Sequence, residues 1–314
     1  MIQYIINRII FIIIALLIAS VLIFIITEII PGDVAQMILG QNATKDALHA
    51  LREKLGLYRP AHIRYFEWIT GILHGDLGTS LTLPGVSVSW LIVRRGRNSL
   101  FLAGTATILL VPISLTLGVI AGLKNEKWQD NLISILTLIA ISLPEFVSGI
   151  FLMLIFSVWF RVLPSSSAID PDANLFNQFK LMILPIVTVS LVIIGYVVRM
   201  LRASVIEASR ADYTRTAILK GLSRFTIITR HVLKNALLPT ITIIAMNIGW
   251  LIGGIIITET VFGFPGLGRL VLFAIKQRDV PLIQSSILVM SAVFLIFNLI
   301  ADLIYAWLNP KIRY

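Results

Sequence analysis

Long uncharged stretches divide this sequence into apolar runs separated by polar connections. A helix needs about 20 consecutive apolar residues to cross the roughly 30 Å of hydrocarbon in a bilayer, and each run approaches or exceeds that length. Only Glu145 interrupts one of them. The pattern predicts an all-α, polytopic membrane protein with six transmembrane helices, over residues 9–27, 98–123, 131–160, 181–198, 235–258 and 280–301.

The first connection, residues 31–97, is long enough to hold structure of its own. Thr44 is a candidate N-cap for a short helix that ends near Gly56, and Tyr58-Arg59-Pro60 breaks it. Residues 63–73 then have the spacing of an amphipathic helix that carries Tyr65, Phe66 and Trp68. These helices either cap the outer mouth of the spans or dock another protein.

The composition agrees with a membrane protein. Hydrophobic residues make up 57% of the chain and charged residues 13%, with a mean hydropathy of +0.93, which does not fit a soluble domain. There is no cysteine, and this excludes disulfides and thiolate metal sites. We expect the first run to be retained as a span, because about 19 apolar residues exceed the roughly 7–15 of a signal peptide.

The distribution of Lys and Arg indicates the orientation. With both termini in the cytoplasm, the inner segments hold 13 basic residues and the outer segments also hold 13. Eight of the outer residues lie in the long loop 31–97, and long loops have little influence on orientation. Without that loop the comparison is 13 inside against 5 outside. We therefore expect cytoplasmic termini. The domains would be an N-terminal transmembrane helix (1–30), an extracytoplasmic loop with short helices (31–97), a core of five helices (98–308) that includes a cytoplasmic loop (199–236), and a cytoplasmic tail (309–314).

Prolines and polar groups inside the spans are candidates for the translocation path, because they are costly in hydrocarbon. Pro112, Pro144 and Pro185 lie within or at the start of three spans and predict kinks. Glu145 either lines a water-filled cavity, pairs with a base such as Arg199, or shows that the span ends elsewhere. On the last span Asn298 and Asp302 share one face, where interhelical hydrogen bonding is the simplest role; the path candidates are Pro144, Glu145, Glu259, Asn298 and Asp302.

Residues 199–236 form a basic, helix-compatible segment with a net charge of +6. Anionic lipid headgroups would attract such a segment. The order of elements suggests more: a helical run to Lys220, a possible C-cap at Gly221, a second run over 222–235, and a new span at Leu238-Pro239. A helix, a break and a helix beside the membrane would form a knob for another protein.

The motif Asp212-Tyr213-x-Arg215-Thr216-Ala217-x-x-Lys220-Gly221-Leu222 resembles the coupling loop of the inner-membrane permease subunits of binding-protein-dependent ABC importers, in the peptide and nickel branch. The resemblance covers nearly the whole chain. Several other motifs are similar to those of this branch, in order and at the family spacing: 31–33, 55–57, 75–80, 231–239, 259–262, 265–269, 278–284 and 298–313.

The chain departs from the family pattern at two places. In the broad importer signature the triplet is Glu-Ala-Ala, and here Arg215-Thr216-Ala217 occupies it, with Gly221 still four residues after Ala217. This departure and the longer stretch that follows Gly221 favour a peptide-type importer over a sugar or phosphate importer. Glu145 replaces a residue that is more often small or uncharged.

The resemblance implies the fold of a type I importer transmembrane domain that works by alternating access. The residues expected to couple to the ATPase are Asp212, Tyr213, Arg215, Thr216, Ala217, Lys220, Gly221, Leu222, His231 and Asn235. No catalytic residue, metal ligand or cofactor is expected in this chain. The expected partners are a second homologous permease in a heterodimer, two ATP-binding subunits that carry ATP and Mg²⁺, an extracytoplasmic substrate-binding protein and membrane lipids, without nucleic acid.

The sequence also weighs against other classes of protein. There is no Gly-x-x-x-x-Gly-Lys-Ser/Thr phosphate loop, so the chain is not itself the ATPase. All four histidines lie outside the spans and no His-Glu-x-x-His motif occurs, which disfavours an intramembrane enzyme. A stand-alone channel or lipid-binding scaffold stays open as an alternative, and so does the cargo, which could be a dipeptide, an oligopeptide, glutathione or a nickel chelate.

Overall fold

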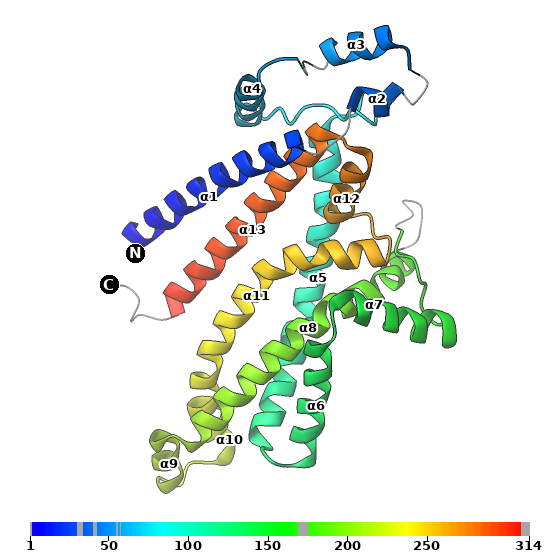
Figure 1. Ribbon diagram of the computed structural model, residues 1–314. Helices are drawn as coiled ribbons and strands as arrows, with labels where there is room; N and C mark the ends of the chain where they lie inside the picture. Colours follow the sequence, from blue (N-terminus) through cyan, green and yellow to red (C-terminus); the bar gives the residue numbers. More distant parts are fainter. Residues whose placement is uncertain are drawn as a thin grey trace. The chain divides into compact units, whose positions relative to one another are not determined.

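The structure is a computed structural model that describes residues 2–29, 34–39, 43–54, 56, 58–168 and 175–308. Within these ranges the regular structure is helical, apart from one isolated bridge between Thr79 and Ser87 (Figure 1). The predicted all-α class is therefore confirmed. The chain forms two compact units, one of Leu100–Phe264 and Phe294–Tyr314 and the other of Ile2–Ser99 and Pro265–Val293.

The first unit is a group of long helices around an apolar core. The core joins α5 (Val88–Leu123), α8 (Leu175–Arg210) and α11 (Leu233–Val261) through side chains such as Leu110, Ile193 and Leu251. Their close packing provides the frame that carries the connecting segments. The remaining elements of this unit are α6 (Trp128–Ser142), α7 (Glu145–Met153), the π-helical turn η1 (Leu154–Trp159), α9 (Asp212–Leu219), α10 (Arg224–Thr226), the π-helical turn η2 (Ile227–Val232) and the end of α13 (Val280–Leu308).

Glycines allow α5 and α8 to approach one another closely. A Cβ at Gly122 would lie 2.6 Å from Cβ of Val205, and one at Gly118 would lie 2.8 Å from Cβ of Leu201. Real side chains do not sit at such distances, so α5 and α8 pack backbone against side chain along this seam. Small residues at helix contacts are typical of membrane proteins, where close packing drives association.

The third predicted span is broken. We expected one span over residues 131–160 with a kink at Pro144, but α6 and α7 are separate helices that meet at an angle of 108° across Leu143 and Pro144. The residue before a proline is driven out of the helical region, and Leu143 is extended. Proline itself is tolerated at the start of a helix, where its missing N–H leaves no bond unmade, and α7 begins directly after it.

The second unit combines the first helix with the segments near residues 61–99 and 265–293. Its elements are α1 (Ile2–Ile29), α2 (Val34–Leu39), α3 (Lys45–Lys54), α4 (Ala61–Leu73), the start of α5, α12 (Leu267–Gln277) and the start of α13. The core lies between the start of α5, α12 and the start of α13, with Val88, Ala274 and Leu282 fully buried. Both short helices predicted in the long loop are present as α3 and α4, and the Thr44 hydroxyl accepts a hydrogen bond from the Ala47 N–H.

The described helices agree with the predicted spans at most positions. Four of them are long and apolar enough to cross a membrane, and the bent pair α6 and α7 raises that number to five if it counts as one span. The predicted run 235–258 lies inside α11, whose 29 residues include Pro239. The number of six spans is consistent with these helices and stays a prediction.

Candidate functional site

The candidate coupling segment lies within residues 199–236 and contains a helix break that the sequence did not indicate. We expected one helical run up to Lys220, but α8 ends at Arg210 and Ala211 is extended, with φ −69° and ψ 150°. The new helix α9 turns Thr214 and Ala217 inward, and both are buried. The Thr214 hydroxyl donates to the Ala208 carbonyl over 2.7 Å, which ties α9 back to the end of α8.

Gly221 ends α9 as the sequence predicted. Its φ is +73°, the left-handed region that glycine adopts without steric strain. The N–H of Gly221 donates to the Ile218 carbonyl, and the N–H of Leu222 donates to the Ala217 carbonyl. These are the two hydrogen bonds of a Schellman motif, which satisfies the last carbonyls of a helix. The turn therefore has one defined geometry.

A second helix follows the turn and continues into α11. The Ser223 hydroxyl accepts from the Thr226 N–H over 3.3 Å and caps the start of this helix. The chain then runs through α10 and η2 into α11. Asn235 donates through Nδ2 to the carbonyl of His231, so this pair stabilises the junction between η2 and α11. The predicted second run and the predicted fifth span are thus one continuous helical path.

The outer surface of this segment is apolar as well as basic. Leu219 and Phe225 expose 81% and 77% of their area, and Tyr213 and Ile218 are also exposed. Exposed groups of this size next to one another are typical of a protein contact. The basic side chains of Arg215 and Lys220 lie on the same exposed helix and its cap.

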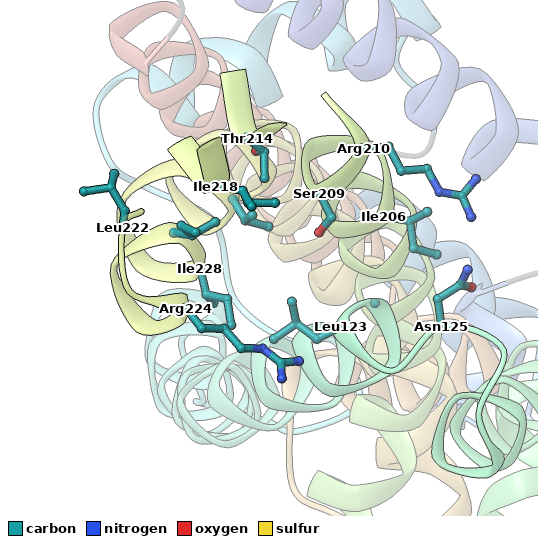
Figure 2. A pocket seen from close by; sticks show the side chains of 13 residues that line it. Leu123, Asn125, Ile206, Ser209, Arg210, Thr214, Ile218, Leu222, Arg224 and Ile228 are labelled. Carbon is teal, nitrogen blue, oxygen red and sulfur yellow. The ribbon is translucent and has the colours of Figure 1, made fainter. Parts of the chain in front are cut away.

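A cavity of about 560 Å³ lies between this segment and the ends of α5 and α8 (Figure 2). Beneath it a small apolar cluster that includes Leu201, Val205 and Val232 fixes the helices to one another. The coupling segment is therefore held by this apolar cluster on one side and borders the cavity on the other. The cavity is lined by Gly122, Leu123, Asn125, Ile206, Ser209, Arg210, Thr214, Ile218, Leu222, Arg224, Ile227, Ile228 and Val232.

An ion pair that sequence reasoning missed joins α6 to α8. Arg202 donates through Nε and Nη2 to the two carboxylate oxygens of Asp130, over 2.5 and 2.8 Å. Asp130 is almost fully buried and also accepts from the Glu126 N–H and the Ser134 hydroxyl. Two charges 72 residues apart gave no sequence signal. The pair fixes the start of α6 to α8, close to the base of the coupling segment.

Glu145 is buried, and of the three alternatives that the sequence left open, the structure agrees with a helix that ends elsewhere than predicted. It is the first residue of α7, directly after the bend at Pro144. Its carboxylate accepts a hydrogen bond from the hydroxyl of Thr258 in α11. The partner is thus a hydroxyl and not the base Arg199, and Glu145 lies at the end of a helix rather than within one.

The other path candidates lie in two places of the first unit. Glu259 is fully buried beside Thr258, near the end of α11. Asn298 donates to the Phe294 carbonyl of its own helix, so the expected interhelical bond of this residue is replaced by one within α13. Asp302 is half-buried one turn further along. The structure brings Glu145 and the end of α11 together, and it places Asn298 and Asp302 on a different helix.

In the second unit, Asp279 joins two of the sequence motifs. It is fully buried, and its carboxylate accepts from the Ser80 hydroxyl over 2.5 Å and from both the N–H and the hydroxyl of Thr82. It also caps α13 by accepting from the Leu282 N–H. The motifs 75–80 and 278–284, about 200 residues apart, therefore form one polar core. The sequence indicated each motif separately but gave no sign that the two are in contact.

These features define a helical, multi-span membrane subunit with a basic and apolar knob at the end of two long helices. The chain belongs to the family described as binding-protein-dependent transport system inner membrane component, which it matches over residues 114–314, and it matches the amino-terminal domain of that family over residues 1–89.

Relatives that span the whole chain support this assignment. The probable peptide ABC transporter permease protein y4tP of Sinorhizobium fredii is 35% identical over 311 residues, which is 99% of each chain. The glutathione transport system permease protein GsiC of Salmonella typhimurium is 36% identical over 314 residues, the full length of both. The chain is thus a permease component of a bacterial ABC importer of the inner membrane, and ATP is hydrolysed by separate subunits.

Proposed function

We propose that this chain forms half of the translocation path of an importer for di- and oligopeptides, paired with a second, homologous permease. Relatives of similar identity are named as peptide and glutathione permeases, so their names leave the cargo open. The peptide assignment is supported by the coupling motif, in which Arg215-Thr216-Ala217 and the long stretch after Gly221 resemble the peptide and nickel branch. A glutathione or nickel-chelate importer of the same family is the second candidate.

The observation that carries the coupling role is the exposed face of α9 and its turn. Leu219, Ile218 and Phe225 present apolar surface, with Arg215 and Lys220 beside them, on a helix end whose geometry the Gly221 motif fixes. An ATP-binding subunit that closes on ATP would move this knob, and the continuous path from Ser223 into α11 would transmit the motion to the spans. Coupling of this kind requires different contacts in the two states.

The coupling segment would then lie in the cytoplasm, together with both termini. The excess of Lys and Arg on that side, once the long loop 31–97 is set aside, supports this orientation. ATP and Mg²⁺ would bind to the two partner ATPases and not to this chain. On the opposite side a soluble binding protein would deliver the cargo.

Gentle purification from native membranes, followed by mass spectrometry, tests the assembly. We expect a different permease, two copies of ATP-binding subunits and a co-encoded binding protein. Recovery of the chain without any ATPase, under conditions that preserve other transporters, would favour the stand-alone channel.

The cargo is tested with the co-purified binding protein. Calorimetric titration with a dipeptide, a pentapeptide, glutathione and a nickel–histidine chelate should give tight binding for a peptide. Transport of the same ligand into vesicles that contain the complete complex should then depend on ATP. Tight binding of glutathione or of the chelate alone would contradict the peptide assignment and leave the importer assignment intact.

A further inference from the structure

The helix α4 belongs to the long loop, yet its side chains contact the apolar part of α1. The hydroxyls of Tyr65 and Ser20 lie 2.9 Å apart. The ring of Phe24 contacts Tyr65 edge-on at a centroid distance of 5.4 Å and stacks on Trp68 at 6.4 Å. These contacts place α4 beside the last two turns of the first span and not above its end.

The depth of these contacts follows from the geometry of α1. Its uncharged run ends at Thr27, so Glu28 marks the level at which the span leaves the hydrocarbon. At 1.5 Å per residue, Phe24 lies about 6 Å and Ser20 about 12 Å inside that level. The aromatic side chains of α4 therefore reach below the membrane surface, and the helix itself lies at the interface.

The side chains of α4 form three stripes at helical spacing. Tyr65, Trp68 and Ile72 form the stripe that faces α1 and is half-buried. The second stripe carries the polar residues Arg64, Glu67 and His74, together with Gly71. The third is the apolar stripe Ile63, Phe66, Thr70 and Leu73. Ile63 exposes 41% of its area, Phe66 63% and Leu73 78%.

Two ion pairs show which way the polar stripe points. Arg64 pairs with Glu28, the residue at the polar end of the first span. Glu67, one turn along the same stripe, accepts from Arg59 over 2.7 Å. The polar stripe thus points toward the water, while Tyr65 and Trp68 lie deeper. Helical rotation then turns Phe66 and Leu73 away from the water and toward the hydrocarbon.

We propose that α4 is an interfacial membrane helix whose apolar stripe, Ile63, Phe66, Thr70 and Leu73, contacts lipid acyl chains at the membrane face where α1 ends. On α1 itself, Leu22, Ile26 and Ile29 are also exposed apolar side chains at the same end of the span. An amphipathic helix with aromatic residues typically sinks its apolar face about 5–10 Å into the boundary between headgroups and acyl chains. The inference does not depend on the cargo, and it assigns lipid to a face that a docking protein could otherwise cover.

Spin labels on single cysteines test this assignment, and the native chain has no cysteine to interfere. Labels at Phe66→Cys and Leu73→Cys report on the apolar stripe, and Glu67→Cys and His74→Cys are matched controls on the polar stripe of the same helix. All four side chains are exposed, so the variants should fold. The assembled importer is placed in vesicles of phosphatidylethanolamine and phosphatidylglycerol, and ATP-driven uptake confirms that each variant is intact.

Collision rates with oxygen, which concentrates in lipid, and with a water-soluble nickel complex then separate the outcomes. We expect oxygen to dominate several-fold at positions 66 and 73 and the nickel complex to dominate at 67 and 74. Access of the nickel complex to all four positions would place α4 in water and overturn the proposal. Protection of 66 and 73 from both reagents would also overturn it, because a protein would then cover the stripe.

Discussion

The backbone at Gly221 is the residue-scale feature on which the coupling proposal depends most. A side chain at φ +73° costs roughly 1–2 kcal/mol, and no atom lies within 4 Å of the position that a Cβ would occupy. We expect Gly221→Ala to shift the turn between α9 and α10 and to reduce ATP-driven transport several-fold, while ATPase activity persists. Transport and ATP hydrolysis measured on the same vesicles give the coupling ratio.

Gly85 supplies the matched control for this substitution. Its φ is +78° and the space around it is also open, but it lies in a turn of the other unit. Gly85→Ala should therefore lower the stability of the protein to a similar degree and leave the coupling ratio unchanged. Equal loss of coupling in both variants would show that Gly221 acts only through stability.

The Asp130 and Arg202 pair makes a second prediction at this scale. Removing Asp130 leaves the Arg202 charge without its partner, but that side chain is 32% exposed, so the cost should be smaller than the roughly 3 kcal/mol of fully buried pairs. Asp130→Asn should lower the midpoint of thermal unfolding by several degrees, and the double variant with Arg202→Gln should recover part of the loss. Additive losses in the two single variants would contradict a direct coupling between the two side chains.

At the scale of elements, the seam between α5 and α8 depends on glycine. Because a Cβ at Gly122 would meet Val205 at 2.6 Å, Gly122→Ala should force the helices apart and lower the midpoint of unfolding. Gly104 lies in the same helix with open space around it, so Gly104→Ala should be neutral or stabilise by about 0.5–1 kcal/mol. Fluorescence-detected melting in detergent compares the two. Equal effects would show that the seam is not closely packed.

The sequence predicted elements wherever one local signal dominated. The apolar runs placed α1, α5, α8, α11 and α13, and the glycine at position 221 ended α9 where we expected. The prediction of one span over residues 131–160 missed the break between α6 and α7. The length of the apolar run was given more weight than the Leu143-Pro144 pair, which ends α6. The break at Ala211 carried no such signal, since no residue around it disfavours helix strongly.

Contacts between distant residues were beyond the reach of sequence patterns. Asp279 with Ser80, and Asp130 with Arg202, join positions that only the fold brings together. Nothing in the spacing of charges along one chain specifies such pairs. The motif 31–33, most of the motif 55–57 and the end of the motif 298–313 lie outside the described residues, so their structural roles stay predictions.

At the scale of the whole molecule, different surfaces have different proposed partners. The knob formed by α9 and its turn would face an ATPase, and the apolar stripe of α4 would face lipid. The assignment to the permease family rests on the full-length relatives and not on either surface. The two surfaces can therefore be tested independently of the family.

Crosslinking from the coupling segment tests the central claim most directly. The chain has no cysteine, so Leu219→Cys, at a side chain that is 81% exposed, carries the only thiol in this subunit. In native membranes a short photoactivatable thiol reagent on this cysteine should crosslink to an ATP-binding subunit, with a yield that changes when ATP is added. The same reagent at Leu73→Cys on α4 is the control and should give no such product. An ATP-binding subunit captured from Leu73 and not from Leu219 would contradict the account.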